Sequence, residues 1–234
     1  MGDIMDFTNT VILITGASRG IGLTLANLLT DYGAKVIGVY NNTKIKNERF
    51  DTIKCNLSKE TEIKKLFKYI KNKYKKIDVV VNCAALCLDS DLYDKTKKEF
   101  MNVLEVNLVG TFLICKYASL LMKKGIIVNM SSTDAFDTFS TFSMDYAASK
   151  AGIENLTKNL ALRLPNLKIC ALAPNWVDTE TVLNMDESYL KSEMKRVGQE
   201  KLLRKEEVVI KIVEIIVNDD IISGDIIRMV SSNE

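Results

Sequence analysis

The segment Thr10–Gly22, with the sequence TVILITGASRGIG, decides the fold of this chain. Its first six residues form an apolar run that predicts a buried β-strand, and the residues that follow show helical periodicity over Ile21–Tyr32. Gly16 permits a tight turn, Gly20 lets the backbone approach a pyrophosphate, and Gly22 lets the helix pack on the sheet. A glycine-rich turn in this context predicts a dinucleotide phosphate loop, with the helix N-terminus facing the anion.

The rest of the chain repeats this alternation of apolar runs and amphipathic stretches. Strands alternating with helices imply right-handed crossovers. We therefore expect a single α/β domain over residues 1–234, a Rossmann-type doubly wound parallel sheet with helices on both faces. Runs rich in Val and Ile predict strands at Thr10–Thr15, Lys35–Tyr40, Asp51–Cys55, Asp78–Asn82, Ile126–Ser131, Lys168–Ala173 and Asp225–Val230. Helical periodicity predicts helices at Ile21–Tyr32, Lys59–Tyr74, Lys97–Lys123, Asp145–Arg163 and Lys205–Asn218.

Residues 175–204 interrupt this alternation, because they mix acidic and basic residues and contain no clear strand pattern. In an open α/β sheet the ligand binds beyond the carboxyl ends of the strands. A long excursion at that edge is typical of a functional loop. We therefore expect residues 175–204 to form a substrate loop or lid.

Composition and charge exclude several classes of function. The 234 residues carry a formal net charge of +2, which gives no electrostatic footprint for nucleic acid and no strong attraction to an anionic membrane. The basic run Lys64–Lys76 has apolar residues at helical spacing, which predicts the solvated face of an amphipathic helix. The chain contains no histidine, so Ser–His triads and histidine bases are excluded, and we expect no metal site.

The cysteines indicate a reducing compartment. They stand at positions 55, 83, 87, 115 and 170, form no Cys-x-x-Cys motif and lie in apolar stretches. This pattern predicts buried, reduced thiols. Together with an acidic N-terminus that lacks a signal-peptide pattern, it predicts a cytoplasmic protein.

Tyr146 and Lys150 are the first candidates for acid–base chemistry. At positions i and i+4 of a predicted helix, they share one face. A free tyrosine has a pKa of about 10, and lowering it to about 7 requires about 4 kcal/mol of extra stabilisation of the phenolate. A nearby ammonium supplies part of this, and a cationic nicotinamide ring supplies more. Because such pairs are common on helix surfaces, this one needs support from other motifs.

Several further motifs occur in order along the chain, and together they are more specific than any one alone. They are Gly-x-x-x-Gly-x-Gly at 16–22, Asn-Cys-Ala-Ala at 82–85, Asn107 in Val-Asn-Leu-Val-Gly, Ser131-Ser132, Tyr146-x-x-x-Lys150 and Pro-Asn-Trp-Val-Asp-Thr at 174–179. In this order they resemble the short-chain dehydrogenase/reductase family over nearly the whole chain. The late segment Ser223–Arg228 and the overall length look most like the 3-oxoacyl-[acyl-carrier-protein] reductases of that family.

The resemblance implies an oxidoreductase that interconverts a carbonyl and a secondary alcohol with a nicotinamide cofactor. In that reaction Tyr146 transfers the proton and Ser132 hydrogen-bonds the substrate oxygen. Lys150 also reaches the nicotinamide ribose, and Asn107 holds a water that relays protons to solvent. Two alternatives stay open: Ser131 in place of Ser132, and an Asn107 that is only a satisfied core amide.

The resemblance also indicates which residues line the cofactor site. An NAD enzyme usually has an acidic residue after the second strand to bind the ribose 2′-hydroxyl. Here that position is Tyr40, followed by Asn41, and Arg19 offers a bidentate partner for a 2′-phosphate, so NADP(H) is favoured over NAD(H). At the adenine position, Asn56 keeps a carbonyl acceptor but lacks a charge. The expected cofactor residues are Gly16, Ser18, Arg19, Gly20, Ile21, Gly22, Tyr40, Asn41, Asn56, Leu57, Asn82, Ala84, Tyr146, Lys150, Val177 and Thr179.

The substrate is the property that the sequence leaves most open. The resemblance favours a 3-oxoacyl thioester on an acidic carrier protein, with Lys123, Lys124 or Arg163 as basic contacts. One alternative is a general alcohol, ketone, sugar or polyol dehydrogenase. Another is a catalytically silent nicotinamide-binding regulatory protein. The resemblance further implies a homodimer or homotetramer that packs through the helices at Lys97–Lys123 and Asp145–Arg163.

Overall fold

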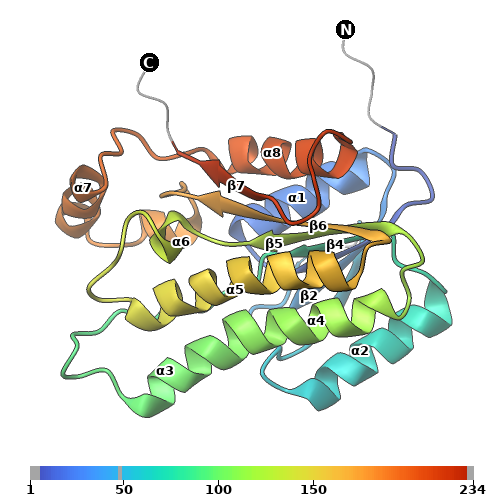
Figure 1. The fold of residues 1–234 in the computed structure, drawn as a ribbon, viewed down its shortest axis with the longest axis horizontal. Coiled ribbons are helices and arrows are strands. Elements are labelled where there is room, and N and C mark those ends of the chain that lie inside the picture. The colour runs from blue at the N-terminus through green and yellow to red at the C-terminus, as the bar shows by residue number, and fades with distance from the viewer. Residues whose placement is uncertain (1–5, 47–48, 231–234) are drawn as a thin grey trace, which may run out of the picture.

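A computed structural model describes residues 6–46 and 49–230, which are built around one parallel sheet (Figure 1). The strand order is β3-β2-β1-β4-β5-β6-β7, and all neighbours are parallel. The predicted doubly wound sheet is confirmed, and each strand end lies within one residue of its predicted position. The strands are β1 Val11–Thr15, β2 Lys35–Tyr40, β3 Asp51–Lys54, β4 Val79–Asn82, β5 Gly125–Met130, β6 Leu167–Pro174 and β7 Ile226–Met229.

Helices cover both faces of the sheet, because alternate side chains along β1 point to opposite faces and those of residues 11–14 are all apolar. Ile12 and Ile14 are buried in one apolar cluster, whereas Val11 and Leu13 are buried in a second cluster on the opposite face. The first cluster lies under α1 (Gly20–Asp31) and α8 (Lys205–Val217); the second lies under α2 (Glu60–Lys73), α4 (Gly110–Ser119) and α5 (Met144–Arg163) (Figure 1).

The order of the strands places the ligand-binding edge. β1 pairs with β2 on one side and with β4 on the other, so the direction of strand addition reverses between β1 and β4. Ligands of open α/β sheets bind beyond the carboxyl ends of the strands at such a point. The loops from these ends gather, together with α6 and α7, at the left of Figure 1.

The stretch Lys97–Lys123, predicted as one helix, is divided and shorter. It forms α3 (Lys97–Leu104), a π-turn (Glu105–Val109) and α4, which ends at Ser119. Among the described residues, only Lys97–Ser119 is long and apolar enough to cross a membrane by length and composition. Its contacts with α2 and α5 are those of a helix packed within an α/β protein.

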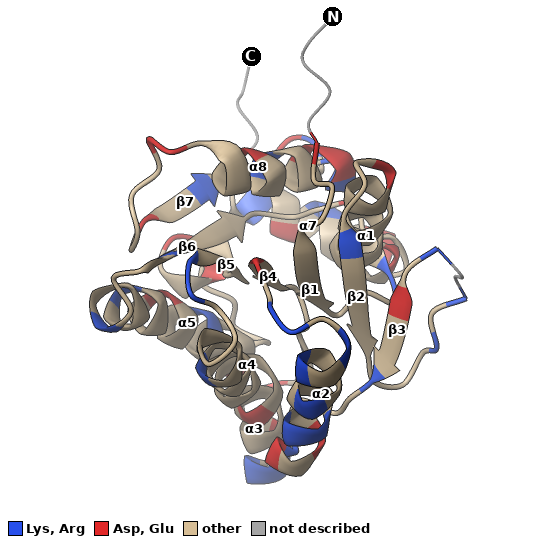
Figure 2. Cartoon of the chain, turned by 90° about the vertical axis from the view of Figure 1, so that its right-hand side faces the viewer, with Lys and Arg blue, Asp and Glu red and all other residues tan. Residues whose placement is uncertain are grey.

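α2 carries most of the basic run Lys64–Lys76, and Figure 2 shows lysines along its outer surface. The apolar side chains Ile63, Leu66, Phe67 and Ile70 are buried against the sheet and α4. The prediction of an amphipathic helix with a solvated basic face is confirmed.

Residues 175–204 form an excursion between β6 and α8 that is closed at its base. Val177 and Leu203 meet in a parallel β-bridge. The buried Gln199 side chain spans the same base, because it accepts from the Trp176 N–H at 3.0 Å and donates to the Trp176 carbonyl at 2.8 Å. The excursion contains two helices that were not predicted, α6 (Glu180–Leu183) and α7 (Glu187–Arg196).

The five cysteines are all free, but they are not all buried. Cys55, Cys115 and Cys170 are buried as predicted. Cys83 is half-buried and Cys87 is exposed, so the prediction was wrong for these two. Both lie in the segment that follows β4, at the ligand-binding edge rather than within the apolar layers.

Candidate active site

The loop between β1 and α1 has the geometry of an anion-binding turn. Gly16 and Gly20 have positive φ angles of 68° and 54°, which glycine adopts without strain. A Cβ on Gly22 would lie 2.4 Å from the Gly16 carbonyl oxygen, so glycine lets α1 fit against the loop. The Gly20 N–H donates to a Glu180 carboxylate oxygen at 2.9 Å. This helix N-terminus therefore binds an anionic oxygen, as a cofactor pyrophosphate requires. The remaining predicted loop residues are Ser18, Arg19 and Ile21, of which Arg19 is exposed.

The expected ribose and adenine residues lie beyond β2 and β3. Tyr40 ends β2 and Asn41 is exposed beyond it, so no carboxylate stands at the position that selects NAD. The Asn56 side-chain oxygen accepts from the Ser58 N–H at 3.0 Å and from the Ser58 hydroxyl at 2.9 Å. Its acceptor is thus already used in a local turn, while Leu57 is buried.

Asn82 belongs to a chain of buried polar groups beneath the site. Its amide donates to the Asn129 side-chain oxygen at 2.9 Å, and the Asn129 amide donates to the Thr157 hydroxyl at 2.9 Å. Within the described residues, the Asn82 side-chain oxygen is buried without a hydrogen-bond partner. The neighbouring Ala84 N–H donates to the Thr15 hydroxyl at 3.2 Å, which joins the ends of β1 and β4. An unpaired acceptor at this junction also fits a bound dinucleotide.

Tyr146, Ser132 and Lys150 come together where β5 meets α5. The Lys150 Nζ lies 5.3 Å from the centroid of the Tyr146 ring. Lys150 is buried, and its ammonium donates to the Met130 carbonyl at 2.6 Å. The Ser132 hydroxyl lies close enough to the Tyr146 phenol to lower its pKa. The site thus combines a phenolic proton donor, a second hydroxyl and a buried cation.

Burial is the main influence on the protonation of this pair. It raises the pKa of Tyr146, electrostatic interactions with Cys87 and Asp134 raise it further, and only the Ser132 hydroxyl lowers it. Burial also lowers the pKa of Lys150 to about 8. Among the chain's own residues desolvation is the largest influence on this pKa, so the lowering expected from Lys150 together with a cationic nicotinamide ring stays a prediction. The chain's own residues favour the protonated phenol, which is the form that donates a proton.

The two adjacent serines have different partners. The Ser131 hydroxyl donates to the Glu154 carboxylate at 2.8 Å, beneath α5. The Ser132 hydroxyl adjoins Tyr146 and accepts from the Asp134 N–H at 3.2 Å. Of the two alternatives, Ser132 is therefore the one that lies beside the phenol.

The Asn107 side chain is used within the core. Its oxygen accepts from the Leu86 N–H at 2.7 Å, and its amide donates to the Leu86 carbonyl at 2.9 Å and to the Ser149 hydroxyl at 3.0 Å. The Ser149 hydroxyl in turn donates to the Tyr146 carbonyl at 2.7 Å. Of the two alternatives for Asn107, the satisfied core amide matches these contacts. The side chain links the π-turn to the turn of α5 that carries Tyr146.

A buried ion pair, missed by the sequence analysis, supports the same turn. The Lys95 Nζ lies 3.0 Å from a carboxylate oxygen of Asp145, and the two side chains are 5% and 0% exposed. Lys95 also donates to the Leu88 carbonyl. The other Asp145 oxygen accepts from the Tyr146 N–H at 2.9 Å. The pair joins the loop after β4 to the first turn of α5.

Val177 and Thr179 bring the excursion onto the phosphate loop. Val177 is buried, and a Cβ on Gly20 would lie 3.3 Å from the Thr179 methyl group. The next residue, Glu180, bonds the Gly20 N–H and lies 3.6 Å from the Lys205 Nζ. Sequence analysis missed Glu180. The one feature of the sequence that could have identified it as a site residue is its position directly after Thr179.

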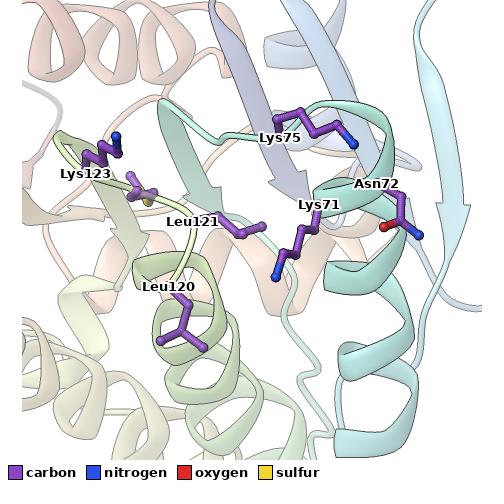
Figure 3. Close-up of a pocket in the computed structure, with 7 residues that line it drawn as sticks. Lys71, Asn72, Lys75, Leu120, Leu121 and Lys123 are labelled. Carbon is purple, nitrogen blue, oxygen red and sulfur yellow. The ribbon is translucent and has the colours of Figure 1, made fainter.

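The basic residues expected to contact a carrier protein lie at the opposite edge of the sheet, so that expectation was wrong. Lys123 and Lys124 precede β5, and Arg163 ends α5. At 1.5 Å per residue, Arg163 is about 25 Å along the helix from Tyr146. A hollow at this edge, between the ends of α2 and α4, is lined by Lys71, Asn72, Lys75, Leu120, Leu121, Met122 and Lys123 (Figure 3).

Comparison with known proteins agrees with the arrangement of the phosphate loop and of Ser132, Tyr146 and Lys150. The family model for short chain dehydrogenases matches residues 10–189. Carbonyl reductase family member 4 of Xenopus laevis is 32% identical over 191 residues, which cover 77% of this chain and 80% of that protein. A 3-oxoacyl-[acyl-carrier-protein] reductase of Aquifex aeolicus is 33% identical over 193 residues, which cover 76% of this chain and 77% of that protein.

The fold comparison extends over almost the whole chain. The ligand-free structure of Thermoplasma acidophilum aldohexose dehydrogenase superposes with a TM-score of 0.85 at 25% identity and covers 99% of both chains. The matched segment 10–189 contains the phosphate loop and the pair Tyr146 and Lys150. The chain therefore belongs to the short-chain dehydrogenase/reductase family of NAD(P)-dependent oxidoreductases.

Proposed function

We propose that this enzyme reduces the keto group of a 3-oxoacyl thioester and prefers NADP(H). The observation that carries the chemistry is the juxtaposition of the Tyr146 phenol, the Ser132 hydroxyl and the Lys150 ammonium. Similarity to the Aquifex 3-oxoacyl-[acyl-carrier-protein] reductase supports the class of substrate.

Each side chain has its own part in the proposed reaction. Tyr146 donates a proton to the substrate oxygen, and burial favours the protonated phenol that this step needs. Ser132 donates a hydrogen bond to the same oxygen and stabilises the charge that develops there. Lys150 would hold the nicotinamide ribose, and Asn107 positions Tyr146 through Ser149. The bound cofactor supplies the hydride for the carbonyl carbon.

A substrate panel tests the proposed class. Acetoacetyl-CoA is expected to give a kcat/KM at least about tenfold above those of simple ketones and aldohexoses, because binding of the non-reacting thioester part lowers the barrier. Initial rates of NADPH oxidation measure this. A preference for an aldohexose would favour the alternative that this enzyme is a sugar dehydrogenase, as the Thermoplasma aldohexose dehydrogenase is. Cofactor binding without turnover on any carbonyl would favour the regulatory alternative.

The preference for NADP(H) rests on Arg19 and on the lack of a carboxylate at Tyr40 and Asn41. NADPH is expected to exceed NADH in kcat/KM by about 10- to 100-fold, since a hydrogen bond to a charged group contributes about 1.5–3 kcal/mol. Arg19→Gln should remove most of that difference by weakening NADPH alone. Arg163→Gln, at the opposite edge, is the matched control and should change neither value. Equal efficiency with NADH in the wild type would contradict the preference.

Assembly and compartment are further proposals. Exposed apolar side chains on α3, α4 and α5 include Met101, Phe112 and Leu162, which fits a symmetric homodimer or homotetramer through these helices. Sedimentation of the purified protein measures the state of assembly. For the compartment, the five free cysteines fit a cytoplasmic, reducing environment.

A further inference from the structure

The Glu180 carboxylate lies where an anionic ligand of the phosphate loop would bind. It accepts from the Gly20 N–H at 2.9 Å, and Gly20 is the first residue of the 12-residue helix α1. The heavy atoms nearest to a Cβ built on Gly20 belong to Thr179, at 3.3 Å, and to Glu180, at 3.6 Å. The positive end of the α1 dipole thus faces a carboxylate of the chain itself.

Glu180 comes from the excursion and not from the nucleotide-binding half of the sheet. It is the first residue of α6 and is 160 residues from Gly20 in sequence. The side chain also pairs with Lys205, at the start of α8. Its own N–H, the Lys205 ammonium and the Gly20 N–H lower the pKa of Glu180, so the group is charged at neutral pH.

We propose that Glu180 is an internal competitor of the cofactor pyrophosphate. One N–H at one helix end does not serve two anions, and like charges in contact repel each other. The pyrophosphate therefore displaces the carboxylate, which keeps its pairing with Lys205. Because Glu180 begins α6, this displacement releases α6 from the phosphate loop. The excursion next to the substrate site is thereby coupled to occupancy of the cofactor site.

Glu180→Gln tests the competition, because it removes the charge and keeps the size of the side chain. The dissociation constant for NADP⁺, measured by isothermal titration calorimetry, is expected to fall about two- to fivefold, as for one charge at an exposed helix N-terminus. Glu187→Gln is the matched control, since Glu187 lies on α7 of the same excursion and pairs with Lys191. That variant should bind as the wild type does. An unchanged or weaker affinity in Glu180→Gln would overturn the proposal.

Trp176, the single tryptophan, reports the release of α6. It stands at the base of the excursion, and its fluorescence is expected to shift on addition of NADP⁺. Glu180→Gln without cofactor should already show part of that shift. Tight binding by calorimetry with unchanged fluorescence in the wild type would overturn the coupling. Both readouts need cofactor binding and no turnover, so a protein that binds NADP⁺ but reduces no thioester would contradict only the proposed function.

Discussion

Tyr146→Phe is expected to lower kcat by about 10²- to 10⁴-fold, the range for loss of a general acid. The substitution removes the phenolic hydroxyl and keeps the ring, whose centroid lies 5.3 Å from the Lys150 Nζ. The affinity for NADP⁺ is therefore expected to stay the same. Steady-state rates with acetoacetyl-CoA and calorimetry with NADP⁺ measure the two quantities.

Tyr93→Phe is the matched control for this substitution. Tyr93 is 93% exposed in the loop before α3, so loss of its hydroxyl should leave kcat unchanged. If Tyr146→Phe turned over as fast as Tyr93→Phe, Tyr146 would not be the proton donor, whatever the substrate.

Lys95→Met is expected to lower the free energy of unfolding by about 3–5 kcal/mol, the cost of leaving one member of a buried ion pair without its partner. The pair with Asp145 is almost fully buried and also supports the turn that carries Tyr146. We therefore expect kcat to fall as well. Urea unfolding followed by circular dichroism measures the loss of stability.

Two further variants separate pairing from lost side-chain volume. Lys191→Met breaks a pair in which Lys191 is 74% and Glu187 81% exposed, and it should cost at most about 0.5 kcal/mol. Adding Asp145→Asn to Lys95→Met removes the buried charge and keeps an acceptor for the Tyr146 N–H, so most of the stability should return. Equal losses in Lys95→Met and Lys191→Met would refute a stabilising role for the buried pair.

The features that could be predicted from the sequence have local causes. A strand followed by Gly16, Gly20 and Gly22 requires only the φ angles and close approaches of one turn. Tyr146 and Lys150 share a face because helical geometry alone sets the i, i+4 spacing. The parallel strands were located because a buried apolar run needs no knowledge of its neighbours.

The features that could not be predicted depend on contacts between distant segments. Lys95 and Asp145 are 50 residues apart, and each reads as an ordinary surface charge. The end of α4 at Ser119 was missed because the apolar pattern continues through Leu120, Leu121 and Met122. The choice between Ser131 and Ser132 needed the position of Glu154, which only the packing of α5 on β5 supplies.

The bridge between Val177 and Leu203 also bears on how such a protein diverges. Since the two ends are already held together, each doubling of the number of residues between them changes the entropic cost of closing the loop by only about 0.6 kcal/mol. The part of the excursion beyond Glu180 can therefore accept insertions, or be exchanged with that of a relative, without disturbing helix α5, which holds Tyr146. Selection for a new substrate can act on this part of the excursion, while the residues that carry out hydride transfer are inherited unchanged.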